Sequence, residues 1–364
     1  MFLEEIYLYN FKNYEELKLS FSKDINCVVG PNGVGKTNLL DAIHYLCLTK
    51  SAFQSVEQLN IKHEEYLFVV RGNFIKQENK TEVQCSFQQG KKKVVKVDRK
   101  EHEKISEHIG RYPCVMISPD DIDLVREGSE FRRRYFDSMI SQLDQVYMQN
   151  LMRYNHTLRQ RNALLKQFSE TQRVDLDLLE PYDQLLLEMG KLIFERRKLF
   201  LEEFTSCFQE FYKDISESHE EVGLVYQSDW GKGDFEAVFK KALDRDVFLQ
   251  RTSKGIHKDD FVFEIGEGYS LKKFGSQGQK KSFVIALKLS QFEVSREAHK
   301  DPPILLLDDI FDKLDDLRIS KILSMIEAHR FGQIFISDAR PERSAQLLAS
   351  LEKEVEFYRV EEFK

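Results

Sequence analysis

The sequence predicts an α/β protein with a mostly parallel core sheet, an antiparallel β-subdomain and an inserted helical lobe. Three patterns predict this fold class. A glycine-rich segment, GPNGVGKT at 30–37, separates an apolar run from a helical pattern. The run ILLLDD at 304–309 places four aliphatic residues before two carboxylates, as in a strand buried on both faces of a parallel sheet. Between them, apolar residues recur at helical spacing from about 129 to 216.

The length of the chain predicts two lobes. Its 364 residues exceed one ordinary core, at roughly 150 residues per domain. We place a nucleotide-binding lobe at 1–122 and 247–364, and a predominantly helical lobe at 123–246. Hydrophobic residues make up 41% of the chain, which is enough to bury full cores and excludes a disordered protein.

The N-terminal elements alternate between strand and turn patterns. Strands are predicted at 6–11 and 25–29, followed by the glycine-rich loop and a helix at 38–48. Runs of alternating polarity around 83–87 and 95–97 predict an antiparallel sheet. An apolar strand at 114–117 follows Pro113, and Ser118 with Pro119 predicts a helix start.

The helical lobe is predicted as an antiparallel pair of long helices. One amphipathic helix explains the apolar spacing from about 129 to 168, and a second explains 185–215. A polar stretch at about 169–177 and then Pro181 interrupt the pattern between them. The remaining elements are strands at 222–226 and 261–265, a helix at about 276–297, and strands at 304–309, 333–337 and 356–360, with a further helix between 309 and 333.

The charge balance excludes a globally basic nucleic-acid binder. The chain has 54 Lys and Arg against 61 Asp and Glu, a net charge of −7. Contact with DNA would therefore depend on local clusters, although a charge run is more often a solvated face. The candidate clusters are the basic stretch at 91–104, which begins with Lys91, Lys92 and Lys93; Arg132, Arg133 and Arg134; and the basic run at 196–198.

Cysteine spacing and the lack of a membrane signal point to a cytoplasmic protein. The five cysteines are far apart and form no CxxC pair, which fits neither a disulfide framework nor a thiolate zinc site. No run approaches the roughly 18 apolar residues of a membrane span, and the first residues lack the pattern of a signal peptide. We therefore expect a soluble chain with reduced thiols.

The glycine-rich segment matches the Walker A spacing, Gly-x4-Gly-Lys-Thr. Glycines allow the backbone N–H groups to approach phosphate oxygens, and the helix N-terminus adds partial positive charge. Lys36 is expected to contact the β- and γ-phosphates of ATP, and the Thr37 hydroxyl to bind Mg²⁺. The predicted nucleotide-binding residues are Gly30, Pro31, Asn32, Gly33, Val34, Gly35, Lys36, Thr37 and Asn38.

Two carboxylates at the end of the predicted strand 304–309 complete a Walker B pattern. Ligands of such sheets bind at the carboxyl ends of the strands, so both side chains would face the nucleotide. Asp308 is expected to hold Mg²⁺, and Asp309 to orient the attacking water as general base. A solvated acidic strand end is the alternative.

A short polar turn before the predicted helix at 276–297 has two interpretations. Ser276, Gly278 and Gln279 could simply cap a helix, which is common for such turns. Their place upstream of the Walker B strand is where ABC-type ATPases carry a signature motif.

Taken together, the motifs resemble the SMC-like branch of the ABC-type ATPases and, within it, the bacterial recombination mediators. The resemblance spans nearly the whole chain in order. The matching segments are LYNFKNYEEL at 8–17, GPNGVGKTNLLDAIHYL at 30–46, SPDDIDLVREGSEFRRRYFD at 118–137, LRQRNALLK at 158–166, GIHKDDF at 255–261, FGSQGQKKSFVIALKL at 274–289 and LLLDDIFDKLD at 305–315.

This resemblance implies an ABC-type ATPase head that acts as an ATP-dependent clamp on DNA. ATP would close a homodimer on double-stranded DNA near single-strand gaps and junctions, with Ser276, Gly278 and Gln279 completing the γ-phosphate site of the opposite subunit. Lys36, Asp308, Asp309 and Ser276 would be the catalytic residues. The implied partners are a RecR-type mediator and, through it, a RecA-type recombinase, with no membrane partner.

The chain departs from the family pattern at several points. Asp309 stands where many relatives carry Glu, and the shorter side chain predicts slow, weak ATPase activity. Where transporters place a switch histidine, the chain has Ser337 and Asp338, so either could sense the γ-phosphate. Short loop differences also occur near Gly128 and Ile256.

Two other function classes remain as alternatives. One is a soluble ABC ATPase subunit of another assembly, in transport or chromosome maintenance. The other is a P-loop kinase or GTPase, which the signature motif and the lack of a guanine-reading NKxD disfavour.

Overall fold

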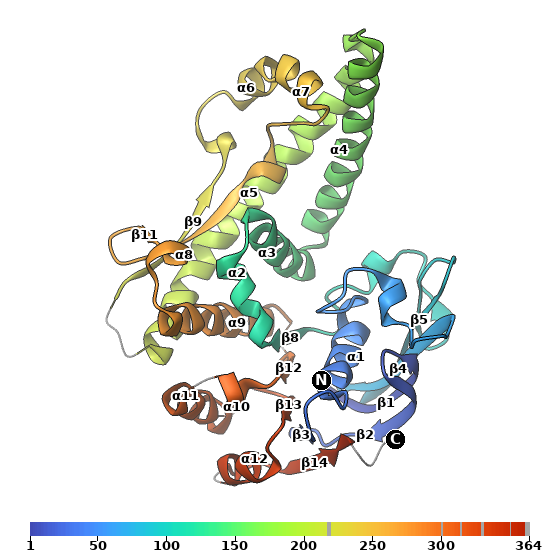
Figure 1. The fold of residues 1–364 in the computed structure, drawn as a ribbon, viewed down its shortest axis with the longest axis vertical. Helices are drawn as coiled ribbons and strands as arrows, with labels where there is room; N and C mark the ends of the chain where they lie inside the picture. Colours follow the sequence, from blue (N-terminus) through green and yellow to red (C-terminus); the bar gives the residue numbers. More distant parts are fainter. Residues whose placement is uncertain (217–219, 300, 314, 329–330, 350, 361–364) are drawn as a thin grey trace. The chain divides into compact units, whose positions relative to one another are not determined.

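The computed structural model describes residues 1–216, 220–299, 301–313, 315–328, 331–349 and 351–360. The chain divides into two compact units (Figure 1). Unit 1 comprises Met1–Ile122, Phe211–Glu217 and Lys281–Lys364, and unit 2 comprises Asp123–Glu210 and Ser218–Lys280.

The sheets of unit 1 have different strand directions. A parallel sheet has the order β14-β3-β13-β12-β8, and an antiparallel sheet has the order β2-β1-β4-β5-β6-β7. The strands of the parallel sheet are β3 (Ile25–Val29), β8 (Cys114–Ile117), β12 (Ile304–Leu307), β13 (Ile334–Asp338) and β14 (Val355–Arg359). Those of the antiparallel sheet are β1 (Phe2–Phe11), β2 (Tyr14–Ser20), β4 (Leu67–Lys76), β5 (Asn79–Gln88), β6 (Val94–Val97) and β7 (Lys100–Glu101). The predicted fold class is therefore confirmed.

Helix α1 (Lys36–Leu48) joins the two sheets of unit 1, because it contacts β8 and β13 on one side and β1, β4 and β5 on the other. Its apolar residues share one core with both sheets. This packing fixes the N-terminus of α1 at the carboxyl ends of the parallel strands. The other helices of unit 1 are α10 (Ile310–Lys313), α11 (Asp316–Glu327), α12 (Pro341–Leu348) and most of α9 (Gln277–His299).

Unit 2 is built from an antiparallel pair of long helices, α4 (Gln145–Thr171) and α5 (Leu176–Ile215). Arg161 on α4 pairs with Asp183 on α5, while Asp144 at the start of α4 pairs with Arg196 further along α5. A three-stranded sheet has the order β11-β10-β9. The remaining elements are α2 (Asp123–Arg126), α3 (Ser129–Leu143), β9 (Val222–Gln227), α6 (Phe235–Lys241), α7 (Leu243–Leu249), β10 (Asp260–Ile265), β11 (Tyr269–Ser270) and α8 (Leu271–Phe274).

The predicted first long helix is wrong in one respect, because the chain breaks it into α3 and α4. Asp144 has extended backbone and its side chain accepts a hydrogen bond from Tyr147 N at 2.9 Å, so it caps a new helix. The predicted polar interruption at 169–177 is confirmed, since α4 ends at Thr171 and α5 begins at Leu176, but the predicted interruption at Pro181 is wrong. Pro181 lies inside the second turn of α5, where the chain tolerates the loss of one backbone donor at an exposed position.

Other boundaries also differ from the sequence expectations. The predicted helix start at 118–121 is a 3-10 turn, Pro119–Ile122, and strands β2 and β4 were not predicted. The sequence predicts that the chain re-enters the nucleotide-binding lobe at residue 247. In the structure residues 218–280 belong to unit 2, and the chain re-enters unit 1 at Lys281. The pairing of β10 with β9 accounts for this difference, since it keeps both strands in one sheet.

Candidate nucleotide-binding site

The Walker A loop of unit 1 connects the buried strand β3 to α1. Gly33 and Gly35 have φ values of 83° and 118°, in the left-handed region that favours glycine. A Cβ on Gly35 would lie 2.4 Å from Asn13 Nδ2, so the loop also needs glycine for space. Gly35 is the N-cap of α1 and offers no side-chain acceptor, which leaves the first N–H groups of the helix available to an anion.

Asn13 in the β1–β2 turn and Tyr14 at the start of β2 support the Walker A loop. Asn13 Nδ2 donates to Val34 O at 2.9 Å, and Asn13 Oδ1 accepts from Asn38 Nδ2 at 2.6 Å. The Tyr14 hydroxyl donates to Gly35 O at 3.0 Å. Sequence reasoning missed this support. The only available signal was the position of both residues in the segment LYNFKNYEEL.

Lys36 lies folded against its own loop. Its ammonium donates to Gly30 O at 2.7 Å and to Pro31 O at 2.9 Å. Burial lowers the pKa of Lys36, and the nearby carboxylates of Asp309 and Asp308 oppose that shift. Because its direct partners are carbonyl oxygens, the ammonium can exchange them for phosphate oxygens.

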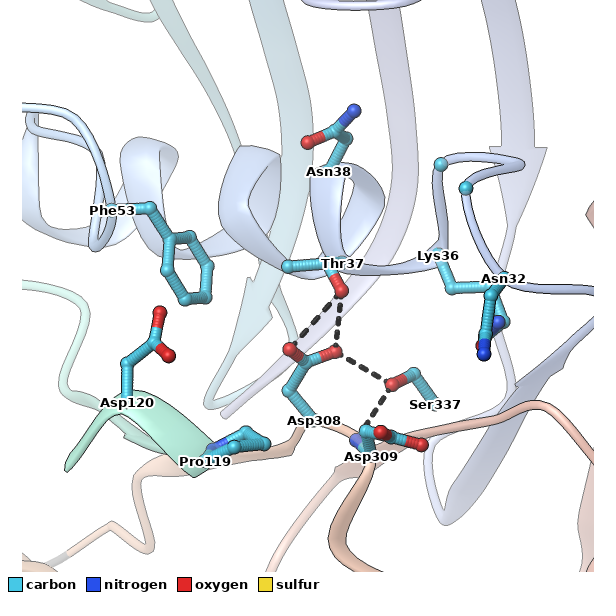
Figure 2. Close-up of a pocket in the computed structure, with 12 residues that line it drawn as sticks. Asn32, Lys36, Thr37, Asn38, Phe53, Pro119, Asp120, Asp308, Asp309 and Ser337 are labelled. Carbon is cyan, nitrogen blue, oxygen red and sulfur yellow. Dashed lines mark hydrogen bonds between the residues drawn. The ribbon is translucent and has the colours of Figure 1, made fainter. Parts of the chain in front are cut away.

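The predicted Walker A and Walker B residues meet at the end of β12 (Figure 2). Thr37 Oγ1 donates to Asp308, with the two carboxylate oxygens 2.9 and 3.1 Å away. Ser337 Oγ donates to Asp308 Oδ1 at 2.6 Å and accepts from Asp309 N at 2.9 Å. Burial raises the pKa of Asp308, and the hydrogen bonds from Ser337 and Thr37 together with the Lys36 charge oppose this.

These residues line an open cleft of about 340 Å³. Thr37 and Asp308 supply a hydroxyl and a carboxylate, the hard oxygen ligands that suit Mg²⁺ when phosphates and waters fill its other positions. The residues present therefore fit the predicted metal. The cleft is lined by Asn32, Gly33, Gly35, Lys36, Thr37, Asn38, Phe53, Pro119, Asp120, Asp308, Asp309 and Ser337. Phe53, Pro119 and Asp120 were not predicted as site residues.

The two candidates for a γ-phosphate sensor lie differently. Ser337 lines the cleft and contacts Asp308. Asp338 is fully buried, its Oδ2 accepts from the Ser344 hydroxyl, and its Oδ1 has no hydrogen-bond partner among the described residues. This placement favours Ser337 as the residue that acts in the cleft, and the sensor role itself stays a prediction.

The predicted signature residues form a helix cap in unit 2. Ser276 Oγ accepts from Gln279 N at 3.2 Å, and Ser276 N donates to Gln279 Oε1 at 2.6 Å. This reciprocal pair is a capping box at the start of α9. Gln279 Nε2 also donates to the Glu220 carboxylate, and Gly278 lies in the first turn of the helix. Ser276 is exposed, so capping and a contact to another subunit are compatible.

The basic clusters predicted to contact DNA are only partly exposed. In unit 1, Lys91 and Lys92 are exposed, whereas Lys93 donates to Thr49 O and to the Glu57 carboxylate.

In unit 2, Arg132 forms a bidentate ion pair with Asp260, with Nε 2.8 Å from Oδ1 and Nη2 2.9 Å from Oδ2. Arg133 donates to Asp259 O at 2.6 Å. Arg134 is exposed and pairs with Glu130 at 2.8 Å. These contacts disfavour Lys93, Arg132 and Arg133 as free phosphate ligands.

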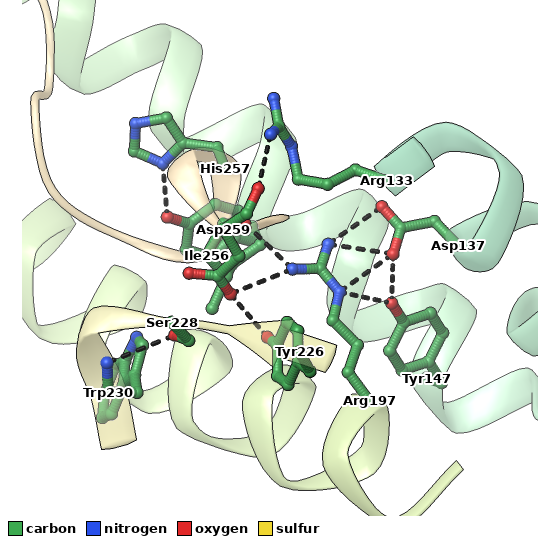
Figure 3. A network of polar contacts seen from close by, with 11 residues as sticks. Arg133, Asp137, Tyr147, Arg197, Tyr226, Ser228, Trp230, Ile256, His257 and Asp259 are labelled. Atoms are coloured by element: carbon green, nitrogen blue, oxygen red, sulfur yellow. Dashed lines mark hydrogen bonds and ion pairs between the residues drawn. The ribbon is translucent and has the colours of Figure 1, made fainter. Parts of the chain in front are cut away.

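Only Arg197 of the basic run at 196–198 is buried, whereas Arg196 is partly exposed and Lys198 is exposed. Arg197 is 1% exposed and contacts Asp137 on α3, Tyr147 on α4 and Asp259 immediately before β10 (Figure 3). Arg196 pairs with Asp144. The run therefore connects elements of unit 2, and this role could not be recognised from its charge pattern. None of the described helices is both long and apolar enough to span a membrane.

Comparison with known proteins agrees with this architecture. The family described as RecF/RecN/SMC N terminal domain matches residues 2–356. The "DNA replication and repair protein RecF" of Cytophaga hutchinsonii is 48% identical over 100% of this chain and 96% of its own. The protein of the same name from Flavobacterium johnsoniae is 47% identical over 96% of this chain and 97% of its own.

Solved structures agree with the sequence relatives. A structure titled "Structure of the recombination mediator protein RecF-ATPrS in RecFOR pathway" superposes with a TM-score of 0.88 at 32% identity, covering 99% of this chain and 96% of that one. An SMC head bound to a ScpA domain shares the fold alone, with a TM-score of 0.54 at 16% identity over 94% of this chain and 90% of that one. With this agreement over nearly its full length, the chain belongs to the RecF family, within the RecF/RecN/SMC group of ATPase heads.

Proposed function

We propose that the chain is an ATP-dependent DNA clamp that acts in recombinational DNA repair and in maintaining replication forks. The observation that carries this proposal is the joined set of Thr37, Asp308 and Ser337 beneath the Walker A loop, with Asp309 beside it. A P-loop connected in this way to two carboxylates is suited to binding and slowly hydrolysing ATP. The relatives' names, which refer to DNA replication, repair and an ATP-bound mediator, support the DNA role.

ATP binding would use groups that the chain already holds in place. The first turn of α1 receives the phosphates, and Lys36 leaves the carbonyl oxygens of Gly30 and Pro31 for the β- and γ-phosphates. Thr37 and Asp308 would hold Mg²⁺, which supplies charge neutralisation at the phosphates. Asp309 orients the attacking water, and its side chain is one methylene shorter than Glu, so turnover is slow and the ATPase weak.

The closed state would be a homodimer with ATP between the subunits. Ser276 at the N-terminus of α9, together with Gly278 and Gln279, completes the γ-phosphate site of the second copy. The dimer encloses double-stranded DNA near gaps and single/double-strand junctions, and hydrolysis releases it. A RecR-type mediator and, through it, a RecA-type recombinase are the proposed partners in a bacterial cytoplasm.

The decisive experiment measures the mass of the protein in solution with and without ATP and with a gapped DNA duplex. We expect a monomer without ATP, a dimer with ATP, and retention of the dimer on DNA that stimulates slow hydrolysis. Lys36→Ala removes the charge placed for the β- and γ-phosphates and should abolish ATP-driven dimerisation. A variant that dimerises with ATP like the wild type would overturn the assignment of this site.

A further inference from the structure

Unit 2 carries an exposed pair of aromatic side chains beside the α9 capping box. Tyr269 and Phe274 are 55% and 67% exposed, although each belongs to a class of residue that is normally well buried. Their rings meet edge to face, with centroids 5.6 Å apart and an interplanar angle of 65°. The two rings therefore form one raised apolar patch, here called the aromatic pair.

The aromatic pair is held firmly in place relative to Ser276. Leu271, at the start of α8, is fully buried and anchors the short helix that ends at Phe274. Gly275 follows, and a Cβ there would lie 2.7 Å from both Leu271 Cδ1 and Leu271 O, so the backbone turns tightly at this point. The next residue is Ser276, fixed by its capping box with Gln279. Phe274 thus stands two residues from the proposed trans-acting serine on a rigid turn.

The charges around the aromatic pair favour a protein surface over a nucleic acid. The segment 264–274, which runs from the end of β10 through β11 and α8, has two acidic residues, Glu264 and Glu267, and two basic residues, Lys272 and Lys273. Such a balanced set offers no net attraction to a phosphate backbone. Exposed aromatic side chains in a neutral surrounding are typical of the anchors of protein–protein interfaces.

We propose that the aromatic pair is a trans contact that packs against the second copy beside that copy's nucleotide cleft. The proposal rests on the proposed function, because Ser276 reaches the second copy's nucleotide only in an ATP-bound dimer. Any surface two residues from Ser276 is then brought against the rim of that cleft. The receiving surface has a suitable feature, since unit 1 has an open hollow that shares Asn38 with the nucleotide cleft and presents Leu59, which is 59% exposed.

The contact would give the dimer an apolar anchor that the polar signature turn cannot supply. Burying two aromatic rings removes a large apolar area from water, whereas Ser276 and Gln279 offer only hydrogen bonds. Dimerisation would then require the aromatic pair even though ATP binding by one subunit does not. This separation makes the proposal testable.

The test measures the dimer dissociation constant by sedimentation, without DNA, in the presence of a non-hydrolysable ATP analogue. Phe274→Ala and Tyr269→Ala should each weaken the dimer about tenfold or more, as loss of an aromatic anchor does. Binding of the analogue to the monomer should stay unchanged. The matched control is Phe248→Ala, which removes an 82% exposed phenylalanine of α7 and should leave the dimer as tight as the wild type.

A second measurement keeps the result independent of any folding defect. Phe274→Trp retains an aromatic ring, and its added fluorescence should shift to shorter wavelength when the analogue closes the dimer. The shift should be absent when Ser276→Arg is also present, because that change blocks closure. A tryptophan at 274 that stays solvent-exposed in the closed dimer would overturn the proposal.

The outcomes separate this proposal from the one on which it rests. If Ser276→Arg dimerises normally, the sandwich dimer itself is wrong. If Ser276→Arg blocks the dimer while Phe274→Ala dimerises like the Phe248→Ala control, only the trans contact is wrong. If Phe274→Ala weakens DNA binding and leaves the dimer intact, the aromatic pair contacts nucleic acid, and that also overturns the proposal.

Discussion

Ser337 Oγ lies 2.6 Å from Asp308 Oδ1 and donates a hydrogen bond to it. The same hydroxyl accepts a hydrogen bond from Asp309 N, so one side chain at the end of β13 fixes two consecutive residues at the end of β12. Asp309 has a positive φ of 48°, an uncommon backbone for a residue with a side chain. Ser337 therefore positions the carboxylate that we propose to bind Mg²⁺, and it supports the turn that carries the proposed general base.

Ser337→Ala should slow ATP hydrolysis by about 10- to 100-fold, because the two carboxylates lose their shared anchor and misplacement of such groups is costly. ATP binding should change little, since the Walker A loop and Lys36 remain. Single-turnover kinetics and equilibrium binding of ATP give the two quantities. Ser337→Thr keeps the hydroxyl and should recover most of the rate, and a Thr variant as slow as Ala would contradict the hydrogen-bond role.

The paired carboxylates should respond differently to loss of charge. Asp308→Asn should lose the organisation of Mg²⁺ and with it hydrolysis, because Thr37 and Asp308 form the predicted metal site. Asp309→Asn should still bind ATP but hydrolyse it on the order of 100-fold more slowly, since it lacks the base that orients the water. It should therefore accumulate as a closed dimer on DNA. Equal loss of ATP affinity in both variants would contradict this division of roles.

The buried Arg197 should be the most sensitive charged position of unit 2. Its guanidinium contacts Asp137 at 2.9 Å, Ile256 O at 2.9 Å and Asp259 at 3.3 Å (Figure 3). Arg197→Ala should lower the free energy of unfolding by about 3–5 kcal/mol, because it leaves the buried carboxylate of Asp259 and the partly buried carboxylate of Asp137 without their cation. Thermal and urea unfolding measure the loss. Arg134→Ala is the matched control, because that side chain is 62% exposed and its pair should contribute little.

Much of the nucleotide-binding unit could be predicted because its elements have sharp sequence boundaries. Strands β3 and β8 run as predicted, since β8 is a continuous apolar run that ends before Ser118 and β3 is apolar except at Asn26 and ends before Gly30. The Walker motifs indicated Lys36, Thr37 and Asp308 through their spacing and their position after buried strands. Asn13 and Ser337 each make two hydrogen bonds to segments distant in the sequence, and no local sequence pattern predicts such contacts.

The helical unit was harder to predict for two physical reasons. Apolar spacing continues through Asp144, so the break between α3 and α4 depends on one side chain that caps a helix. Arg197 lies in a run of basic residues that resembles a solvated surface, yet its partners come from three other segments. In both cases tertiary contacts decided the outcome.

Buried histidines should make the fold sensitive to acid. Burial lowers the pKa of His108 in unit 1 and of His257 in unit 2 to about 4 each. In the unfolded chain the pKa is about 6.5, so below that pH the unfolded state takes up protons that the folded state does not. Stability should therefore fall as pH drops from about 6.5 towards 4, with no further loss from these groups below that.

Melting temperatures between pH 7.5 and 4.5 check this expectation. His108→Gln should reduce the fall of the melting temperature at acid pH (the acid limb of the profile), because it removes one group that must stay neutral in the fold. His63→Gln is the control, since that side chain is 94% exposed and should leave the profile unchanged. An acid limb that is the same in all three proteins would contradict the assignment.

The last prediction tests whether Ser276 acts on the nucleotide of another subunit. Ser276→Arg should bind ATP normally as a monomer and fail to dimerise, because a bulky cation obstructs the γ-phosphate contact. Lys36→Ala should also fail to dimerise with ATP, because it lacks the charge that binds the phosphates. In a mixed dimer of the two variants, one site contains both defects and the other contains neither. ATPase activity and DNA retention should therefore recover in part on mixing, although each variant alone is inactive. If mixing recovers nothing while Ser276→Arg alone hydrolyses ATP normally, the capping box is the whole role of this residue and the trans assignment fails.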